Sequence, residues 1–396
     1  MTPYVVTTEQ AQLQEVAREF SKRVVIPRAA TLDRNSNPAD CMSWEIVEEA
    51  SKIGLRALTL DPKYGGAGAD TLTAAIVIEE LCKGDLGAGV IMAQIYKLVQ
   101  VMQAACTEDQ KDRWLTMFSE DPRGIVAVAA TEPDTSSNYV IPYEDPRAGF
   151  RTTAVKVEGG WLLNGFKHFI SNGNTSRIYL ILAQTMKNVP LAEGSTFFML
   201  ERGTEGFSSG KVHDKMGERL VNNSELILHD CFVPERDVMG GVDQGFELLR
   251  EFFRASNVYA AASVLGVADA AYDRALGWTQ QRVQGGKPLI EHDTVAVQIA
   301  EMRMSLEVAR AYIRQAAFAV DHPEAWDHGM AVFPKVFAAQ TAWNVTTRAL
   351  ELHGGYGFMR EVGMEKLVRD AAAFLHSDGA NLTLLLKAVQ SIRAML

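Results

Sequence analysis

The sequence is poor in the residues that build disulfide frameworks and structural zinc sites. Only four of its 396 residues are cysteines, and no two of them form a C-x-x-C pair. Scattered thiols of this kind are typical of proteins kept in a reducing compartment and do not suggest zinc ligation. We therefore expect a cytoplasmic location, no metal ion and no disulfide framework among Cys41, Cys82, Cys106 and Cys231.

Positive charge and long apolar runs are also scarce. The formal net charge is -10 and the pI is near 5.4, which argues against a surface that binds nucleic acid or an anionic membrane. No run of about eighteen apolar residues occurs, and the first residues lack a basic stretch followed by an apolar one. The sequence thus predicts a protein that neither spans a membrane nor carries a standard export signal.

A dinucleotide-binding fingerprint is missing as well. The glycine-rich loop at residues 61–70 does not spell G-x-G-x-x-G, and no strand is predicted before it. What the chain does have is an ordinary globular composition, with 47% hydrophobic and 22% charged residues. A chain of this length exceeds the size at which one hydrophobic core stops growing, so two or three domains are expected.

The spacing of apolar residues changes twice along the chain and predicts three domains. Residues 1–122 show helical spacing, with Thr7 in a capping-box pattern before the first helix. Residues 123–238 consist of short β-branched and aromatic runs between Gly, Asn and Pro, which indicates a middle β-sandwich or barrel. Residues 239–396 return to helical spacing and predict a C-terminal four-helix bundle. The expected fold class is therefore α+β.

The expected strands are short and the expected C-terminal helices are long. The strand candidates in the middle domain are residues 125–130, 150–157, 161–163, 168–171, 178–183, 195–200 and 225–233. The helix candidates in the C-terminal domain are residues 246–281, 291–319, 329–352 and 364–394. Their alanine content permits neighbouring helices to approach closely.

A carboxylate near the C-terminus is the strongest candidate for chemistry. Asp378 follows the apolar residues 371–375 and precedes Gly379, which lets the backbone bend and another group approach closely. A carboxylate in such surroundings is partly desolvated, and partial desolvation favours a general base. The alternative is an ordinary Asp-Gly turn, which is common in proteins.

Five motifs follow one another in the order and spacing of one flavoenzyme family. They are T-E-P at residues 131–133, W-L-L-N-G-F-K-H-F-I-S-N-G at 161–173, K-M-G-E-R at 215–219 with F-V-P at 232–234, R-V-Q-G-G-K-P at 282–288, and E-L-H-G-G-Y-G at 351–357. Each motif alone is weak evidence. Together they make the chain resemble the acyl-CoA dehydrogenase family along nearly its whole length.

The resemblance implies that FAD binds between the β-domain and the C-terminal bundle. By analogy Ser171 donates a hydrogen bond to the flavin N5, Phe169 packs on the ring, and Thr131 lies near the pyrimidine edge. A flavin needs donors at these atoms, because they stabilise charge on the reduced ring.

The resemblance also implies that a neighbouring subunit contributes to each FAD site. It assigns Arg282 to the diphosphate of the neighbour's FAD, and Gly354 and Gly355 to a close backbone approach on the adenosine side. A site shared in this way implies an oligomer, and the family is usually a homotetramer. Glu351 stands near the same FAD where the family has Gln, and a carboxylate beside a diphosphate is unfavourable.

For the substrate, the resemblance implies an acyl-CoA thioester. Asp378 aligns with the family's base, which removes the α-proton while a hydride leaves the β-carbon for the flavin. Ser137 aligns with a serine near the pantetheine chain, and Gly379 allows the substrate to approach closely. The electron acceptor implied is an electron-transfer flavoprotein or another acceptor.

The sequence departs from the family at the base itself. The usual residue is Glu preceded by Tyr, whereas this chain has Asp378 preceded by Ser377. Asp withdraws the carboxylate by about 1.5 Å, and a misplacement of this order costs about a hundredfold in rate if nothing compensates. Ser377 enlarges the pocket beside the base, so we expect a branched or cyclic acyl group. Asp85 is a second possible acid near the acyl pocket, although a helix cap is the commoner role for such a residue.

Two other functions stay open at this point. One is a flavin oxidase of the same fold that uses an aspartate base on a carbon acid and passes electrons to O2, as nitroalkane oxidases do. Those enzymes carry an arginine beyond the base, where this chain has Leu384 and Leu385. The other is a non-catalytic relative that binds flavin or CoA.

Overall fold

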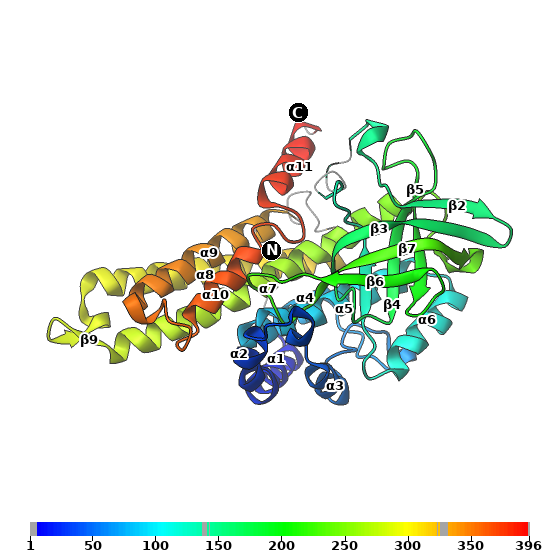
Figure 1. Ribbon diagram of the computed structural model, residues 1–396. Helices are drawn as coiled ribbons and strands as arrows, with labels where there is room; N and C mark the ends of the chain where they lie inside the picture. The colour runs from blue at the N-terminus through cyan, green and yellow to red at the C-terminus, as the bar shows by residue number, and fades with distance from the viewer. Residues whose placement is uncertain (1–5, 137–140, 142, 323, 325–331, 395–396) are drawn as a thin grey trace.

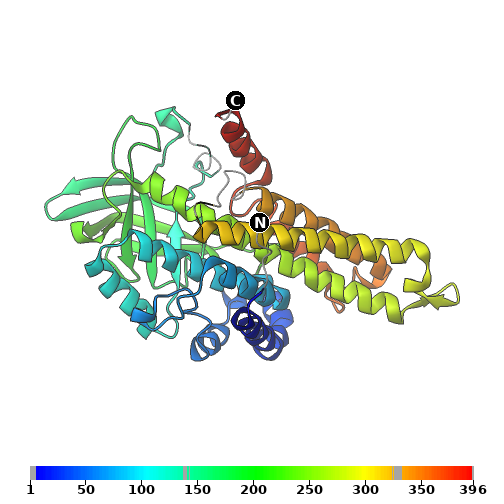
Figure 2. The ribbon, with the colours of Figure 1, turned by 180° about the vertical axis from the view of Figure 1, so that it is seen from behind.

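The protein is described here by a computed structural model covering residues 6–136, 141, 143–322, 324 and 332–394. Helices, then a sheet, then helices again follow one another along the chain. Figures 1 and 2 show the long C-terminal helices extending away from the sheet, with the N-terminal helices packed beneath the junction between them. The predicted α+β class, with its helical, β and helical order, is confirmed.

The N-terminal helices are held by capped ends and by an apolar interior. They are α1 (Thr8–Phe20), α2 (Ile26–Asp33), α3 (Trp44–Lys52), α4 (Thr71–Gly84), α5 (Leu86–Ala105) and α6 (Glu108–Glu120). The predicted capping box at Thr7 forms, with Gln10 as the reciprocal partner. Most side chains of α4 and α5 are buried, so these two helices carry the core of this part of the chain.

The middle of the chain forms one hydrogen-bonded sheet that curls over itself. Its strands are β1 (Val126–Ala129), β2 (Thr153–Val157), β3 (Gly160–Ser171), β4 (Ile178–Gln184), β5 (Ser195–Glu201), β6 (Phe207–Val212), β7 (Asn223–Pro234) and β8 (Val238–Met239). The strand order is β6-β7-β3-β2-β4-β5-β8, with β1 also paired to β4. Trp161 on β3 and Phe198 on β5 lie 5.7 Å apart between ring centroids, although their strands are not neighbours. The curled sheet therefore encloses a second hydrophobic core.

The C-terminal bundle is built on α7 (Gly245–Gln281), α8 (Asp293–Asp321) and α9 (Phe333–His353). A short hairpin of β9 (Val283–Gln284) and β10 (Lys287–Pro288) joins α7 to α8. A Cβ at Gly266 of α7 would lie 2.3 Å from the carbonyl oxygen of Glu79 on α4. Glycine is therefore required where α7 crosses the N-terminal helices.

The predicted fourth helix, residues 364–394, is wrong as a continuous element. The structure divides it into α10 (Met364–Ala373) and α11 (Asn381–Ala394), with Asp378 in the break. Asp378 and Gly379 both have positive φ, 51° and 96°, which no α-helix accommodates. The strand predictions also need correction, because residues 161–163 and 168–171 belong to the single strand β3, and β6 and β8 were not predicted.

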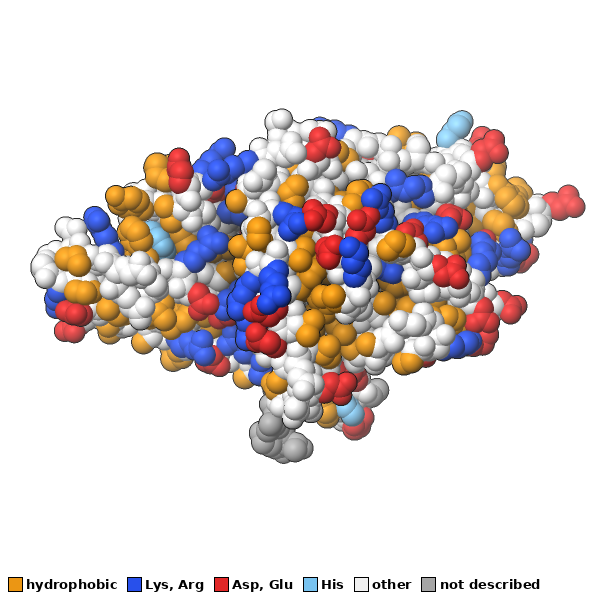
Figure 3. Space-filling model, turned by 90° about the horizontal axis from the view of Figure 1, so that it is seen from below, with side chains coloured by type: hydrophobic (Ala, Val, Ile, Leu, Met, Phe, Trp, Pro, Cys, Tyr) orange, Lys and Arg blue, Asp and Glu red, His pale blue; other side chains and the backbone are white. Residues whose placement is uncertain are grey.

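Charge is distributed evenly on the face seen in Figure 3, where blue and red side chains lie interspersed rather than gathered by sign. No helix among the described residues is long and apolar enough to cross a membrane. All four cysteines are buried and free.

Candidate functional site

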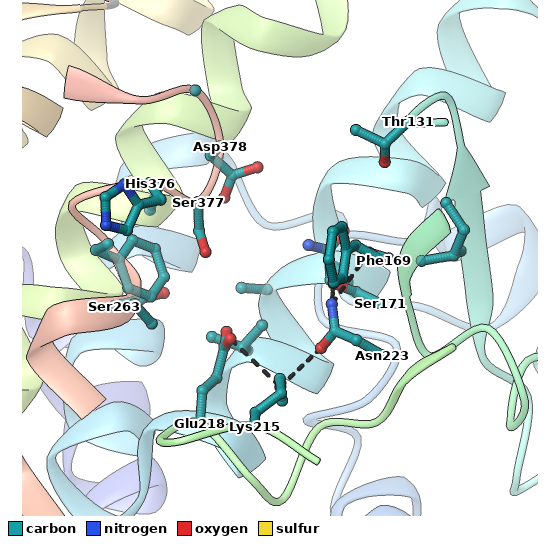
Figure 4. Close-up of a pocket in the computed structure, with 18 of the residues that line it drawn as sticks. Thr131, Phe169, Ser171, Lys215, Glu218, Asn223, Ser263, His376, Ser377 and Asp378 are labelled. Atoms are coloured by element: carbon teal, nitrogen blue, oxygen red, sulfur yellow. Dashed lines mark hydrogen bonds and ion pairs between the residues drawn. The ribbon is translucent and has the colours of Figure 1, made fainter. Parts of the chain in front are cut away.

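A cavity of about 880 Å³ lies where the sheet, α5, α7 and the α10–α11 connection meet. Figure 4 shows two facing walls, with Ser377 and Asp378 on one side and Thr131, Phe169 and Ser171 on the other. The cavity therefore brings the predicted base opposite the predicted flavin-binding residues, which are far apart in the sequence.

Asp378 lies in a turn that is stabilised by hydrogen bonds from the buried Lys335. Lys335 of α9 donates to the carbonyl oxygens of Phe374 (2.8 Å) and Gly379 (2.7 Å) and to Oδ1 of Asn381 (2.9 Å). Burial lowers the pKa of Lys335 to about 8. Three acceptors on one ammonium fix both sides of the turn, so α9 holds the backbone that carries Asp378.

The carboxylate of Asp378 has two polar partners that sequence reasoning did not identify. Its Oδ1 accepts from Lys97 Nζ at 3.1 Å and from Ser256 Oγ at 3.0 Å. Lys97 Nζ also donates to Ser256 Oγ at 3.0 Å. The Lys97 side chain is 2% exposed and that of Asp378 is 18% exposed. The only sequence signal is that Lys97 is the single charged residue of the largely apolar α5.

The facing wall presents an exposed aromatic ring and two hydroxyl groups. Phe169 has a positive φ of 58° and is 58% exposed, which is unusual for a large apolar side chain and turns its ring toward open space. Ser171 Oγ accepts from Asn223 Nδ2 at 3.2 Å, so its own hydrogen is available to a ligand. Thr131, two residues after the end of β1, lines the same cavity.

A second carboxyl group also lines the cavity, and sequence reasoning missed it. Glu218 is 7% exposed, and its Oε2 lies 3.4 Å from Lys215 Nζ. Burial raises the pKa of Glu218, Lys215 opposes this, and the charge of Asp378 adds to it. Its sequence signal is its position directly after K-M-G, where the motif assigns Glu218 no role of its own. Figure 4 shows Glu218 below the space between the two walls.

The remaining predicted cofactor residues gather in a second cavity of about 500 Å³. Arg282, Glu351, Gly354 and Gly355 all line it, at the end of the bundle where α7 meets the 3₁₀ turn Gly354–Tyr356. A Cβ on Gly354 or Gly355 would meet no atom within 4 Å. The structure thus divides the predicted cofactor residues into two groups, with Thr131, Phe169 and Ser171 in the first cavity.

The remaining site predictions have separate outcomes. Ser377 and Gly379 line the first cavity beside Asp378. Ser137 lies outside the described residues. Asp85 is 4% exposed, caps α5 through the Ala88 amide at 3.0 Å and pairs with Lys366 Nζ at 2.6 Å. Asp85 is not among the described residues that line the cavity.

One group of potential metal ligands occurs among the described residues, formed by His168, His213 and Glu225 with ligand atoms within 4.8 Å of one another. Zinc holds its ligand atoms about 2.0–2.2 Å from the ion, which requires closer spacing between them. The His168 Nε2 to Glu225 Oε1 distance is 3.9 Å. Both imidazole rings instead contact Phe169, at 3.9 Å and 4.8 Å between ring centroids. The metal-free expectation stays a prediction.

The two cavities fit the FAD that the resemblance implies. The first offers an exposed ring to pack on an isoalloxazine and a hydroxyl hydrogen from Ser171. The second offers side-chain-free glycines for a close approach, the guanidinium of Arg282, and the buried Nε1 of Trp278, which has no hydrogen-bond partner. An unpartnered buried donor beside a cavity is what a polar ligand would satisfy.

Comparisons with known proteins agree with this geometry. Three family models match the chain: the acyl-CoA dehydrogenase N-terminal domain at residues 7–120, the middle domain at 127–231 and the C-terminal domain at 243–391.

Among curated relatives, an acyl-CoA dehydrogenase of Bacillus subtilis is 31% identical over 95% of this chain and 96% of its own. A cyclohex-1-ene-1-carbonyl-CoA dehydrogenase of Syntrophus aciditrophicus is 32% identical over 95% of this chain and 87% of its own. The butyryl-CoA dehydrogenase structure from Megasphaera elsdenii has a TM-score of 0.91 and 29% identity, and covers 98% of this chain and 99% of its own.

Proposed function

Because the chain belongs to the acyl-CoA dehydrogenase family of FAD-dependent oxidoreductases, we propose that it introduces an α,β double bond into an acyl-CoA thioester. Asp378 is the proposed base. The observation that carries this proposal is the position of Asp378 across one cavity from Phe169 and Ser171 (Figure 4). A thioester in this space lies between a proton acceptor and a flavin-binding wall.

The residues divide the work as follows. Asp378 removes the α-proton, and its backbone N–H donates a hydrogen bond to the carbonyl oxygen of the thioester. Among the described residues this N–H has no hydrogen-bond partner, so it is available as a donor. FAD, when bound, accepts the hydride from the β-carbon. Ser171 donates to the ring and Phe169 packs on it, while Thr131 serves the pyrimidine edge.

The acyl group is proposed to be branched or cyclic. Ser377 lines the cavity beside the base, where the family's usual tyrosine would occupy more space. The shorter Asp378 requires the α-carbon to lie closer to the turn, and Gly379 leaves room for it. One matched relative is named for a cyclic acyl group, the cyclohex-1-ene-1-carbonyl-CoA dehydrogenase, which supports this proposal.

Anaerobic mixing with a panel of acyl-CoA thioesters tests the proposal. We expect a yellow holoprotein whose flavin absorbance is lost most rapidly with branched or ring thioesters. A linear thioester without a second carboxylate that equals or exceeds all of them would contradict the acyl-group proposal. Peroxide formed rapidly from a carbon acid without CoA would favour the oxidase, and an unchanged flavin with every compound would favour the non-catalytic relative.

The oligomeric state, the electron acceptor and the cellular location are proposals as well. A homotetramer would let Arg282, Glu351, Gly354 and Gly355 of one subunit serve the FAD of another, because they lie in the second cavity. Ser137 remains the proposed pantetheine contact. An electron-transfer flavoprotein or another acceptor would reoxidise the flavin. The cytoplasmic location and the domain limits 1–122, 123–238 and 239–396 stay proposals.

A further inference from the structure

Lys97 is a buried cation in the wall of the acyl cavity. It lies within α5, and its ammonium lies 5.1 Å from the centre of the Phe252 ring. Its two hydrogen bonds go to Ser256 and Asp378. An ammonium carries three hydrogens, so one donor is left for a ligand in the cavity.

A second buried lysine, Lys335, has a structural role and differs from Lys97 in its hydrogen bonds. All three donors of Lys335 are occupied by atoms of the turn, and Lys335 is not among the described residues that line the cavity. Lys97, by comparison, faces the cavity and pairs with the reacting carboxylate itself. Its present partner, Asp378, must change charge during catalysis.

Two other cations on the cavity wall, Lys215 and Arg369, have different carboxylate partners. Lys215 pairs with Glu218 and donates to Asn223 Oδ1 at 2.7 Å. Arg369 pairs with Asp33 at 2.7 Å and with Glu365 at 2.6 Å. Lys97 is thus distinguished by its pairing with the proposed base.

We propose that Lys97 recognises a carboxylate on the acyl group, so that the enzyme acts on CoA monothioesters of dicarboxylic acids. This rests on the proposed function, because it assigns the substrate class of the same base. When the acyl carboxylate accepts the hydrogen bonds of Lys97, Oδ1 of Asp378 is released from its cationic partner and can face the α-proton. Binding energy of the correct acyl group is thereby used to activate the base. The branched or cyclic shape and the carboxylate are independent features of this group.

Charge balance favours a substrate whose acyl group carries a carboxylate over a substrate with a simple alkyl chain. In the reaction the α C–H bond breaks and its proton bonds to an oxygen of Asp378, while a hydride from the β-carbon reduces FAD. Asp378 is then neutral. With an alkyl chain, Lys97 would be left as a buried ammonium without a counter-ion, which is strongly unfavourable. With a substrate carboxylate, its charge stays compensated throughout.

Binding to the wild-type holoprotein, reduced beforehand with dithionite under anaerobic conditions, tests the proposal without turnover, because a reduced flavin accepts no hydride and Asp378 stays in place beside Lys97. The probes are two chain-matched pairs, butyryl-CoA with succinyl-CoA and pentanoyl-CoA with glutaryl-CoA, titrated by calorimetry. We expect the dicarboxylic member to bind at least about tenfold more tightly, the size of one hydrogen bond to a charged group. Lys97→Met should abolish the preference, and Lys97→Arg should retain part of it.

Lys83→Met is the matched control, because Lys83 also pairs with a carboxylate, Asp269 at 2.6 Å, but is not among the described residues lining the cavity. It should leave the preference intact. Equal binding of the paired thioesters, or a preference that survives Lys97→Met, would overturn the inference. Flavin bleaching of the wild-type protein separates the two proposals: no bleaching by any thioester contradicts the proposed function, whereas bleaching by butyryl-CoA with no preference for succinyl-CoA contradicts only the role of Lys97.

Discussion

Two carboxyl groups compete for the role of base, and their surroundings differ. Asp378 lies on the wall facing Phe169 and accepts hydrogen bonds from Lys97 and Ser256. Glu218 is nearly inaccessible and pairs with Lys215. A base must reach the α-proton of a substrate that lies against the flavin wall, the side of the cavity formed by Thr131, Phe169 and Ser171. The geometry therefore assigns this role to Asp378.

Replacement of Glu218 by Gln should therefore be tolerated. The amide keeps the shape of the side chain, and the backbone N–H of residue 218 still donates to Asp370 at 2.7 Å. We expect the rate of flavin reduction to fall by no more than about tenfold, less than the loss typical of a general base. Stopped-flow measurement of flavin reduction with the preferred thioester checks this. If the Glu218→Gln protein contains normal FAD but is inactive, the role of base belongs to Glu218 and not to Asp378.

For single residues, the sequence predicts those that belong to a family motif but not the side chains that form hydrogen bonds with them. Asp378, Phe169 and Ser171 were predicted, and the structure brings them to one cavity. Lys97 and Asp378 are 281 positions apart, and a single sequence gives no sign that a lysine within an apolar helix meets that carboxylate. Contacts of this kind depend on how α5, α7 and the α10–α11 connection pack.

The connection between α10 and α11 is the element on which the site depends. Its positive φ angles and its three bonds to Lys335 explain why a segment with continuous helical spacing is nevertheless broken. The apolar periodicity alone predicted one helix, although the Asp-Gly pair already marked a bend. The strand β6 was missed for a related reason, because its residues F-S-S-G-K-V are mostly polar or small.

Substitution of Gly379 by Ala should disturb this connection. The residue has a φ of 96°, and a Cβ would lie 2.8 Å from Leu384 Cδ2. We expect a loss of about 1–3 kcal/mol in the free energy of unfolding, from backbone strain and the clash. Denaturant titration measures the loss. Gly277→Ala is the matched control, because Gly277 lies inside α7 and a Cβ added there would meet no atom within 4 Å, and it should stabilise by about 0.5–1 kcal/mol.

The end of α9 should make stability depend on pH. His353 is 5% exposed, stacks on Trp278 and shares a hydrogen bond between Nδ1 and the Ala349 carbonyl. Burial lowers the pKa of His353 below 6.5, and nearby Arg274 adds to this while the Ala349 carbonyl opposes it. The unfolded chain therefore binds more protons than the folded chain just below pH 6.5, so stability decreases as the pH falls through that range. His353→Gln should weaken this dependence in denaturant midpoints of the holoprotein, and an unchanged slope would contradict the assignment.

The whole molecule separates the two parts of the proposed FAD site. The flavin wall lies beside the sheet, and the glycine turn with Arg282 lies near the far end of the bundle, next to the β9–β10 hairpin (Figures 1 and 2). Family motifs predicted both groups of residues. Which subunit they serve depends on assembly, and a single chain does not specify that.

Complementation between two inactive variants tests the shared site. Arg282→Ala should lose FAD binding at the neighbour's site, and Asp378→Asn should lose the base of its own site. Co-expressed subunits should recover about a quarter of wild-type activity, because a quarter of random pairs join an intact Asp378 to a neighbour's intact Arg282. Activity no higher than that of either variant alone would indicate that Arg282 acts within its own subunit.

The rate of anaerobic flavin reduction in a single turnover tests the central claim most directly. The preferred acyl-CoA is mixed with wild-type protein and with Asp378→Asn protein of equal FAD content. The account predicts rapid reduction in the wild-type protein and a rate at least about a hundredfold lower in the variant. Equal rates in the two proteins would contradict it.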